Sequence, residues 1–248
     1  MINLRYFWFG ANVIIWTVIF ASTGIIGSIF EWRGKFMSWI AITWSKILLY
    51  IGGIDYKVFG LNNLDPNRSY LFAANHESAL DIPIVFAGLP YHIVAVAKIE
   101  LKRIPIFGWS MMAGGHFFVD RKNKKTALKS MENAKVSMLK NPRSIIIYPE
   151  GTRSNDGSIK PFKKGGLVLA IDMDLPVVPV ALCGTRECLG EKKFRLQKNT
   201  IEMRIGKPIE TITLGYKDRN QFVEAIRDEV VRLKSNSDYK PSVPNQFN

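Results

Sequence analysis

The segment Ser144–Ser154, SIIIYPEGTRS, joins a short apolar run to an abrupt polar turn. The run Ser144–Tyr148 is continuously apolar after its first residue, which is typical of a strand buried on both faces of a sheet. Such strands belong to parallel sheets that carry helices on both sides. The turn that follows supplies a carboxylate, a glycine, a hydroxyl and a guanidinium, from Glu150, Gly151, Thr152 and Arg153. In open α/β sheets the chemistry lies beyond the carboxyl ends of the strands, so this turn is a candidate functional segment.

Strand-like runs alternate with helical periodicity on both sides of this segment. The predicted strands are Tyr56–Phe59, Tyr70–Ala74, His92–Ala97, His116–Val119, Ser144–Tyr148, Val177–Leu182 and Thr200–Ile205. The predicted helices are Leu80–Leu89, Ile99–Met112, Lys124–Lys140, Gly165–Met173 and Asn220–Leu233. This order predicts an α/β domain over residues 54–234, with a largely parallel sheet flanked by helices. Residues 235–248 are rich in Ser, Asn and Pro, and we expect a loose tail there.

Composition limits the classes of function. The chain has 248 residues, of which 47% are hydrophobic, which excludes an intrinsically disordered chain. Its formal net charge of +13 favours anionic partners such as phosphates, acidic lipid surfaces or nucleic acid. It has two cysteines and three histidines, and their spacing matches neither a disulfide framework nor a metal site.

The N-terminal 53 residues differ from the rest. Residues 6–30 contain no charged side chain, and as a helix they would be roughly 37 Å long, enough to cross a hydrocarbon core. A second apolar run, residues 36–51, is interrupted by Lys46. Five of the six tryptophans lie in this region, as is typical of helices at the headgroup interface. We expect two membrane-embedded helices over residues 1–53 that either span the bilayer or dip into one leaflet; the alternative is a buried helical hairpin of a soluble protein.

His76 and Asp81 form a candidate acid–base pair. On one regular helix a separation of five residues would place the two side chains about 140° apart. If His76 lies in a loop and Asp81 opens the next helix, the carboxylate can fold back onto the imidazole. A carboxylate on one ring nitrogen leaves the other free as a general base, so a substrate hydroxyl could serve as the nucleophile. Alternatively, Asp81 only caps a helix and His76 is an ordinary loop residue.

Several cationic groups could complete a binding site. Arg153, in the turn after the strand Ser144–Tyr148, could bind a phosphate through two hydrogen bonds. Lys98 and Arg121 each follow a predicted strand and could face the same edge of the sheet. The alternatives are a solvated turn and ordinary surface charges. His92, His116, Cys183 and Cys188 have no partner at useful spacing, so we interpret them as structural.

Four blocks of the sequence resemble the glycerolipid acyltransferase family, and within it the bacterial 1-acyl-sn-glycerol-3-phosphate (lysophosphatidic acid) acyltransferases. The first block is Asn75-His76-x-Ser78-x-x-Asp81, which matches the HxxxxD signature of that family. The second runs from Ala97 to Arg121, the third is Pro149–Ser154 and the fourth is Val178–Ala181. The blocks occur in the expected order and cover roughly residues 55–210.

The resemblance implies a reaction and a set of roles. His76 would be the general base and Asp81 its orienting carboxylate. Lys98, Arg121 and Arg153 would bind the acceptor phosphate, Glu150 and Thr152 would shape the acceptor site, and the backbone near Gly151 is a hypothetical oxyanion donor. The reaction would transfer a fatty acyl group from acyl-CoA or acyl-carrier protein to the sn-2 hydroxyl of lysophosphatidic acid, giving phosphatidic acid.

The same resemblance implies the surroundings of the enzyme. We expect no cofactor and no metal, a location at the membrane on the cytoplasmic face of the bacterial inner membrane, and membrane lipids as partners. These lipids include lysophosphatidic acid and anionic phospholipids. An acyl tunnel could be lined by Ile104, Ile106, Phe107 and Trp109.

Three other interpretations fit parts of the sequence. Another acceptor, either glycerol-3-phosphate or a lysophospholipid with a larger headgroup, would use the same motifs. A non-catalytic protein that binds or transfers anionic lipids would also combine a basic body with an apolar leader, but would not need His76 paired with Asp81. The sequence lacks a stacking or zinc motif for nucleic acid, so we expect no nucleic-acid partner.

Overall fold

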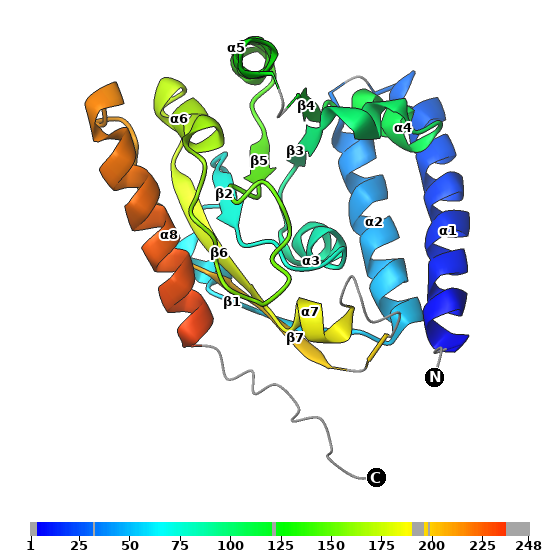
Figure 1. The fold of residues 1–248 in the computed structure, drawn as a ribbon. Coiled ribbons are helices and arrows are strands. Elements are labelled where there is room, and N and C mark those ends of the chain that lie inside the picture. The colour runs from blue at the N-terminus through cyan, green and yellow to red at the C-terminus, as the bar shows by residue number, and fades with distance from the viewer. Residues whose placement is uncertain (1–3, 32, 121–122, 190–195, 198, 237–248) are drawn as a thin grey trace.

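A computed structural model describes residues 4–31, 33–120, 123–189, 196–197 and 199–236. Its centre is a seven-stranded sheet with the order β1-β7-β6-β2-β5-β3-β4 (Figure 1). The strands are β1 (Asp55–Phe59), β2 (Leu71–Ala74), β3 (Ile93–Lys98), β4 (Phe117–Val119), β5 (Ser144–Ile147), β6 (Val177–Cys183) and β7 (Thr200–Ile205). All neighbouring strands are parallel except β6 and β7. The predicted largely parallel sheet is therefore confirmed, with β1 and β7 running opposite to the other strands.

The burial of the strands explains why the apolar runs predicted them. Every residue of β2, β5 and β6 is buried, as expected for central strands covered on both faces. The edge strand β1 instead alternates between exposed and partly buried residues. Continuous apolar sequence thus marks the central strands β2, β5 and β6, and alternating exposure marks the edge strand β1.

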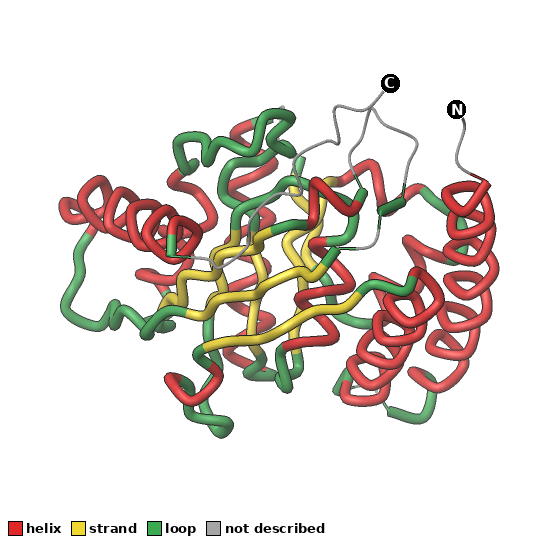
Figure 2. Tube along the Cα trace, turned by 90° about the horizontal axis from the view of Figure 1, so that it is seen from below, coloured by secondary structure: helices red, strands yellow, loops and turns green. Residues whose placement is uncertain are grey.

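Helices cover both faces of the sheet (Figures 1 and 2). One face carries α3 (Asp81–Gly88), with α1 (Leu4–Ser28) and α2 (Lys35–Gly52) beyond it, and the other carries α5 (Lys124–Lys140), α6 (Lys164–Asp172) and α8 (Arg219–Ser235). The shorter helices are α4 (Phe107–Ala113), α7 (Thr185–Cys188) and the 3₁₀ turns η1 (Leu61–Asn63), η2 (Ile99–Arg103) and η3 (Tyr216–Asp218). The sequence did not predict α7.

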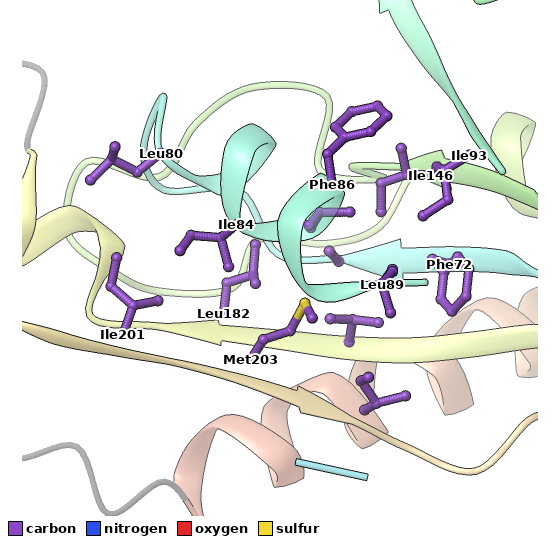
Figure 3. Packing of buried hydrophobic residues seen from close by; sticks show 14 of the residues in the cluster. Phe72, Leu80, Ile84, Phe86, Leu89, Ile93, Ile146, Leu182, Ile201 and Met203 are labelled. Carbon is purple, nitrogen blue, oxygen red and sulfur yellow. The ribbon is translucent and has the colours of Figure 1, made fainter. Parts of the chain in front are cut away.

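Tight packing fixes α3, the helix that opens with Asp81, against the sheet. Figure 3 shows Ile84 and Leu89 of this segment beside Leu182 and Met203 of the strands, and all four side chains are buried. Each buried apolar side chain of this size contributes roughly 1.5–3 kcal/mol relative to exposure. Gly88 brings the helix close, since a Cβ there would lie 2.4 Å from the Met203 methyl group. The position of Asp81 is therefore set by the core.

The N-terminal helices form a hairpin that is partly anchored on this core. Phe9 and Leu49 are buried in the same apolar cluster as α3. The Trp44 indole Nε1 donates a hydrogen bond to Thr17 Oγ1 across the hairpin, at 3.1 Å. By length and composition α1 could cross a membrane, and it is the one such helix in the described part of the chain. Large apolar side chains lie exposed along α1, among them Ile14, Ile15, Ile19 and Ile26.

The structure differs from the prediction between residues 99 and 112. The single helix predicted over Ile99–Met112 is wrong: η2 ends at Arg103 and α4 begins at Phe107. Pro105 lacks an N–H for helical hydrogen bonding, and Ile106 adopts a φ of 63° that a helix cannot accommodate. The predicted loose tail begins at residue 235, where α8 ends, and residues 237–248 lie outside the described part of the chain.

Candidate active site

Polar segments from separate parts of the sequence meet at one edge of the sheet. The parallel strands β2, β5 and β3 are neighbours, so their carboxyl ends lie side by side. Asn75 and His76 follow β2, the turn beginning at Tyr148 follows β5, and β3 ends at Lys98. Asn75, His76 and the turn after β5 lie beyond the strand ends, as predicted, whereas Lys98 is the last residue of β3 and Arg121 lies outside the described residues.

His76 and Asp81 are in direct contact. The imidazole Nδ1 lies 2.7 Å from the Asp81 Oδ2 atom. The same oxygen accepts the backbone N–H groups of Glu77 at 2.7 Å and Ser78 at 2.9 Å. The Asp81 carboxylate thus turns back onto the preceding loop and makes no cap for its own helix, whose N-cap residue is Leu80. This excludes the alternative in which Asp81 is only a helix cap.

These contacts determine which nitrogen of His76 can act as a base. An ionised carboxylate can only accept hydrogen bonds, so Nδ1 must carry the proton that lies between the two side chains. The second nitrogen, Nε2, then holds a lone pair. The His76 side chain is 15% exposed while that of Asp81 is fully buried, so the ring can meet a substrate and the carboxylate cannot.

The turn after β5 holds His76 from the other side. The Tyr148 ring stacks on the imidazole, with centroids 4.2 Å apart and planes inclined by 24°. The Ser154 N–H donates to the His76 carbonyl oxygen at 2.8 Å. Burial and the Asp81 carboxylate raise the pKa of Tyr148 well above its ordinary value, with the nearby charge of Arg153 opposing the shift. Sequence reasoning missed the stacking role of Tyr148, although this residue begins the YPEGTRS segment.

Glu150 is bound to backbone groups. Its Oε1 accepts the His76 N–H at 2.9 Å and its Oε2 accepts the Lys160 N–H at 3.1 Å. The side chain is buried, which raises its pKa against the opposing effect of these two hydrogen bonds. Glu150 therefore fixes the backbone at His76.

The other candidate residues of this turn, Gly151, Thr152 and Arg153, are exposed or partly exposed. Gly151 has a φ of 79° and its N–H donates to the Tyr148 carbonyl oxygen at 3.0 Å, so in this conformation the turn itself uses the proposed oxyanion donor. Thr152 is exposed and Arg153 is partly buried. The Lys160 ammonium donates to the Arg153 carbonyl oxygen at 3.0 Å and fixes the backbone from which the guanidinium projects.

Lys98 lies at the same edge of the sheet, but it forms an ion pair with Glu100. Its ammonium is 3.2 Å from the Glu100 carboxylate, and both side chains are substantially exposed. The structure brings it to the correct edge of the sheet without a contact to His76 among the described residues. Lys98 is in register with Val119 of β4. Arg121 follows two positions later, and it lies outside the described residues.

Asn75 and Ser78 fix the His76 loop to β6 and to the residue that follows α7. The Asn75 side chain accepts the Leu182 N–H at 2.7 Å and donates to the Leu182 carbonyl oxygen at 2.9 Å. The Ser78 hydroxyl donates to the Leu189 carbonyl oxygen at 2.6 Å. The sequence held a signal for both, since they belong to the block NHxSxxD, but gave no indication of their partners.

The other histidines are partly buried, the two cysteines are fully buried, and we interpret all four as structural residues. His116 accepts the Ala95 N–H through Nδ1 at 2.8 Å, and burial lowers its pKa to about 4. Burial also lowers the pKa of His92. Cys183 and Cys188 are buried thiols outside any disulfide. Over the described ranges, no three His, Cys, Asp or Glu side chains are grouped so as to hold a metal ion.

Comparison with known proteins finds acyltransferases that are similar to this chain. A family model described as "Acyltransferase" matches residues 55–183. A 1-acyl-sn-glycerol-3-phosphate acyltransferase of Saccharomyces cerevisiae is 34% identical over 193 residues, covering 77% of this chain and 63% of the relative. One of Limnanthes douglasii is 33% identical over 186 residues, covering 75% and 66%. The chain thus spans just under two thirds of the length of these relatives.

A solved structure extends the similarity to the N-terminal hairpin. The crystal structure of the 1-acyl-sn-glycerophosphate (LPA) acyltransferase PlsC from Thermotoga maritima superposes with a TM-score of 0.77 and 25% sequence identity. The match covers 96% of this chain and 97% of that protein.

Proposed function

The chain belongs to the acyltransferase family, and from this we propose that it transfers a fatty acyl group from a thioester to the sn-2 hydroxyl of lysophosphatidic acid, giving phosphatidic acid. The observation that carries the proposal is the contact between His76 and the buried Asp81 at the carboxyl edge of the sheet. A protein that only binds lipid has no use for a base oriented in this way.

The proposed mechanism needs no covalent enzyme intermediate. His76 Nε2 takes the proton of the acceptor hydroxyl while that oxygen attacks the thioester carbon. The resulting imidazolium is stabilised by Asp81, to which its Nδ1–H donates. The tetrahedral intermediate collapses, the carbon–sulfur bond breaks, and the departing sulfur takes the proton back from His76. The products are phosphatidic acid and a free thiol, and His76 returns to its starting state.

The acceptor phosphate is proposed to bind beside this base. Arg153 is the best placed cation because its turn is hydrogen-bonded to the His76 loop. Lys98 is the last residue of β3, the strand beside β5, and Arg121 comes two positions after the end of β4 in the sequence, so both would add positive charge. Gly151 and Thr152 belong to the same turn as Arg153, and Glu150 contributes by holding the His76 backbone.

The donor and the acyl path are further parts of the proposal. Acyl-CoA or acyl-carrier protein would supply the thioester, and we expect no resident cofactor or metal. Ile104 and Trp109 expose apolar surface near the ends of η2 and α4, beside Ile106 and Phe107. We propose that these four residues contact the acyl chain.

The N-terminal helices would bring the site to its substrate. Lysophosphatidic acid resides in the bilayer, and the exposed apolar side chains of α1 are suited to contact with acyl chains. We propose that the protein is bound at the membrane among anionic phospholipids, on the cytoplasmic face of a bacterial inner membrane.

An acceptor panel tests the proposal. Purified protein in detergent would receive a labelled long-chain acyl-CoA or acyl-carrier protein together with lysophosphatidic acid, glycerol-3-phosphate or lysophosphatidylcholine. We expect phosphatidic acid as the dominant product. Preferential acylation of another acceptor would replace the substrate but keep the reaction. Lipid binding without product from any acceptor would favour the non-catalytic alternative.

A further inference from the structure

An ion pair connects the end of α8 to the loop that carries His76. The Lys234 ammonium contacts the Glu77 carboxylate at Oε1. The Glu77 side chain is 3% exposed and that of Lys234 is 24% exposed. The two residues are 157 positions apart, so their contact depends on the packing of α8 against the sheet.

Lys234 also contacts the turn after β5. Its ammonium donates to the Gly157 carbonyl oxygen at 2.7 Å. The Gly157 N–H donates to the Ser154 hydroxyl at 3.1 Å, and the Ser154 N–H donates to the His76 carbonyl oxygen at 2.8 Å. One ammonium group thus joins the loop of the base to the turn that carries Arg153.

Glu77 is itself tied to the acid–base pair. Its N–H donates to Asp81 Oδ2, the oxygen that also binds His76. Its Oε1 accepts the Asn75 amide at 2.9 Å. A movement of the Glu77 backbone would therefore change the contact between Asp81 and His76.

Because both side chains are largely buried, stability alone does not explain the ion pair between Glu77 and Lys234. Removing two charges from water is costly, and apolar side chains of similar volume commonly serve as well or better. A cation in the last turn of α8 is explained by the helix dipole, but a buried carboxylate at position 77 is not. The pair instead specifies one arrangement of two loops.

We propose that Lys234 and Glu77 are positioning residues that align His76 with the turn carrying Arg153. The kinetic consequences of this inference rest on the proposed acyltransferase function, whereas the structural consequences do not.

The kinetic test compares two changes at one position. In Lys234→Met we expect kcat to fall between about 10- and 100-fold, since small displacements of a base cost rates of this size. Lys234→Arg keeps a cation that can reach both oxygens and should retain most of the activity. Arg232→Met is the matched control on the same helix, because Arg232 pairs with Glu229 at the exposed surface. It should leave kcat unchanged.

A double variant separates positioning from general stability. Lys234→Met leaves Glu77 as an unpaired buried carboxylate, and Glu77→Gln removes that charge. We expect the double variant to recover part of the lost kcat. If the fold-loss in kcat of the double variant is instead the product of the two single fold-losses, the positioning role is overturned.

The pH dependence of kcat gives a second test of the positioning role. Burial raises the pKa of Glu77, Lys234 from α8 opposes this shift, and Asp81 from α3 adds to it. Without Lys234 the pKa rises further, so Glu77 is neutral at lower pH and becomes an unpaired charge as the pH increases. The kcat of Lys234→Met relative to wild type should therefore fall with rising pH, and Lys234→Met/Glu77→Gln should lack this trend. A flat ratio in Lys234→Met would contradict the proposal.

Hydrogen exchange provides a readout that needs no substrate. In Lys234→Met the amides of residues 76–78 and 154–157 should exchange faster, and in Arg232→Met they should not. Unchanged exchange in these two loops overturns the inference even if the wild type is an active acyltransferase. If the wild type shows no acyl transfer, the proposed function fails, while faster exchange would still support the positioning role.

Discussion

Asp81 shows how much of the site depends on a single atom. Its Oδ2 accepts three hydrogen bonds, from His76 Nδ1 and from the backbone N–H groups of Glu77 and Ser78. Its Oδ1 is buried and has no partner within the described residues. The carboxylate therefore both shapes the loop and orients the His76 ring.

Replacing Asp81 should stop the chemistry while the fold persists. In Asp81→Asn the amide oxygen can keep the two backbone hydrogen bonds, but no charge remains to stabilise the His76 imidazolium. If the amide group turns, its NH₂ faces Nδ1 and imposes the wrong tautomer. We expect kcat to fall on the order of 10³-fold with KM little changed. Steady-state kinetics and a melting curve check this, and a fall of only a few-fold would contradict the assigned role.

At the residue scale the sequence predicted pairs that are close along the chain. His76 and Asp81 are five positions apart, so a single loop can bring them into contact. Glu77 and Lys234 could not be predicted in this way, since 157 positions separate them and no local pattern joins them. Glu150 has the residue type of a substrate contact, but burial gives it backbone partners instead.

The segment between η2 and α4 shows strain at the element scale. Ile106 has a φ of 63°, and the Phe107 N–H donates to the Pro105 carbonyl oxygen at 2.6 Å, which closes a tight γ-turn. This conformation is costly for any side chain with a Cβ. The helical periodicity of residues 99–112 gave no indication of it, because the γ-turn depends on local backbone geometry.

Two small substitutions isolate this strain. Ile106→Gly and Ile106→Ala both remove the apolar side chain, but only glycine adopts a positive φ without steric cost. We expect Ile106→Gly to have the higher free energy of unfolding, by about 1 kcal/mol. Denaturant unfolding in detergent would measure the difference. Equal stabilities would mean that the turn is unstrained.

The lowered pKa of His116 predicts that the folded protein loses stability in acid. Its pKa is about 4 in the folded protein, chiefly because of burial, against an ordinary value of 6.5. The unfolded chain therefore binds a proton first, and the stability present above pH 6.5 is lost as the pH falls toward 4. In His116→Asn the amide oxygen can still accept the Ala95 N–H, but the side chain does not titrate. The melting temperature of this variant should fall less steeply between pH 6.5 and 4, and an unchanged slope would exclude His116 as the cause.

At the scale of the whole molecule, the N-terminal hairpin packs against the core of the α/β domain and leaves part of its apolar surface exposed. Phe9 and Leu49 attach the hairpin to the core, while Ile15 and Ile19 of α1 remain 55% and 46% exposed. The two N-terminal helices lie where the sequence predicted apolar helices. Continuous apolar runs identified both the buried strands and the two N-terminal helices, because each must exclude water along its length. The docking of the hairpin on α3 depends on tertiary packing and was not predictable.

Membrane binding should depend on the exposed face of α1. We expect Ile15→Asn/Ile19→Asn to weaken partitioning into lipid vesicles between about 10- and 100-fold, since each side chain is about half exposed and would contribute about half of the roughly 1.5–3 kcal/mol of a fully buried isoleucine. Ile212→Asn is the control, because Ile212 is 72% exposed and lies after β7 in the α/β domain. Co-sedimentation with vesicles measures both variants. Equal binding would place the membrane contact elsewhere.

The central claim is that His76 is the base of an acyl transfer to lysophosphatidic acid. The most direct measurement is the initial rate of labelled phosphatidic acid formation from a long-chain acyl thioester, by wild type and by His76→Ala. Matched melting temperatures would establish that the variant is folded. We expect steady product formation by wild type and none above background by the variant. Product formed at comparable rates by both proteins would contradict the role of His76.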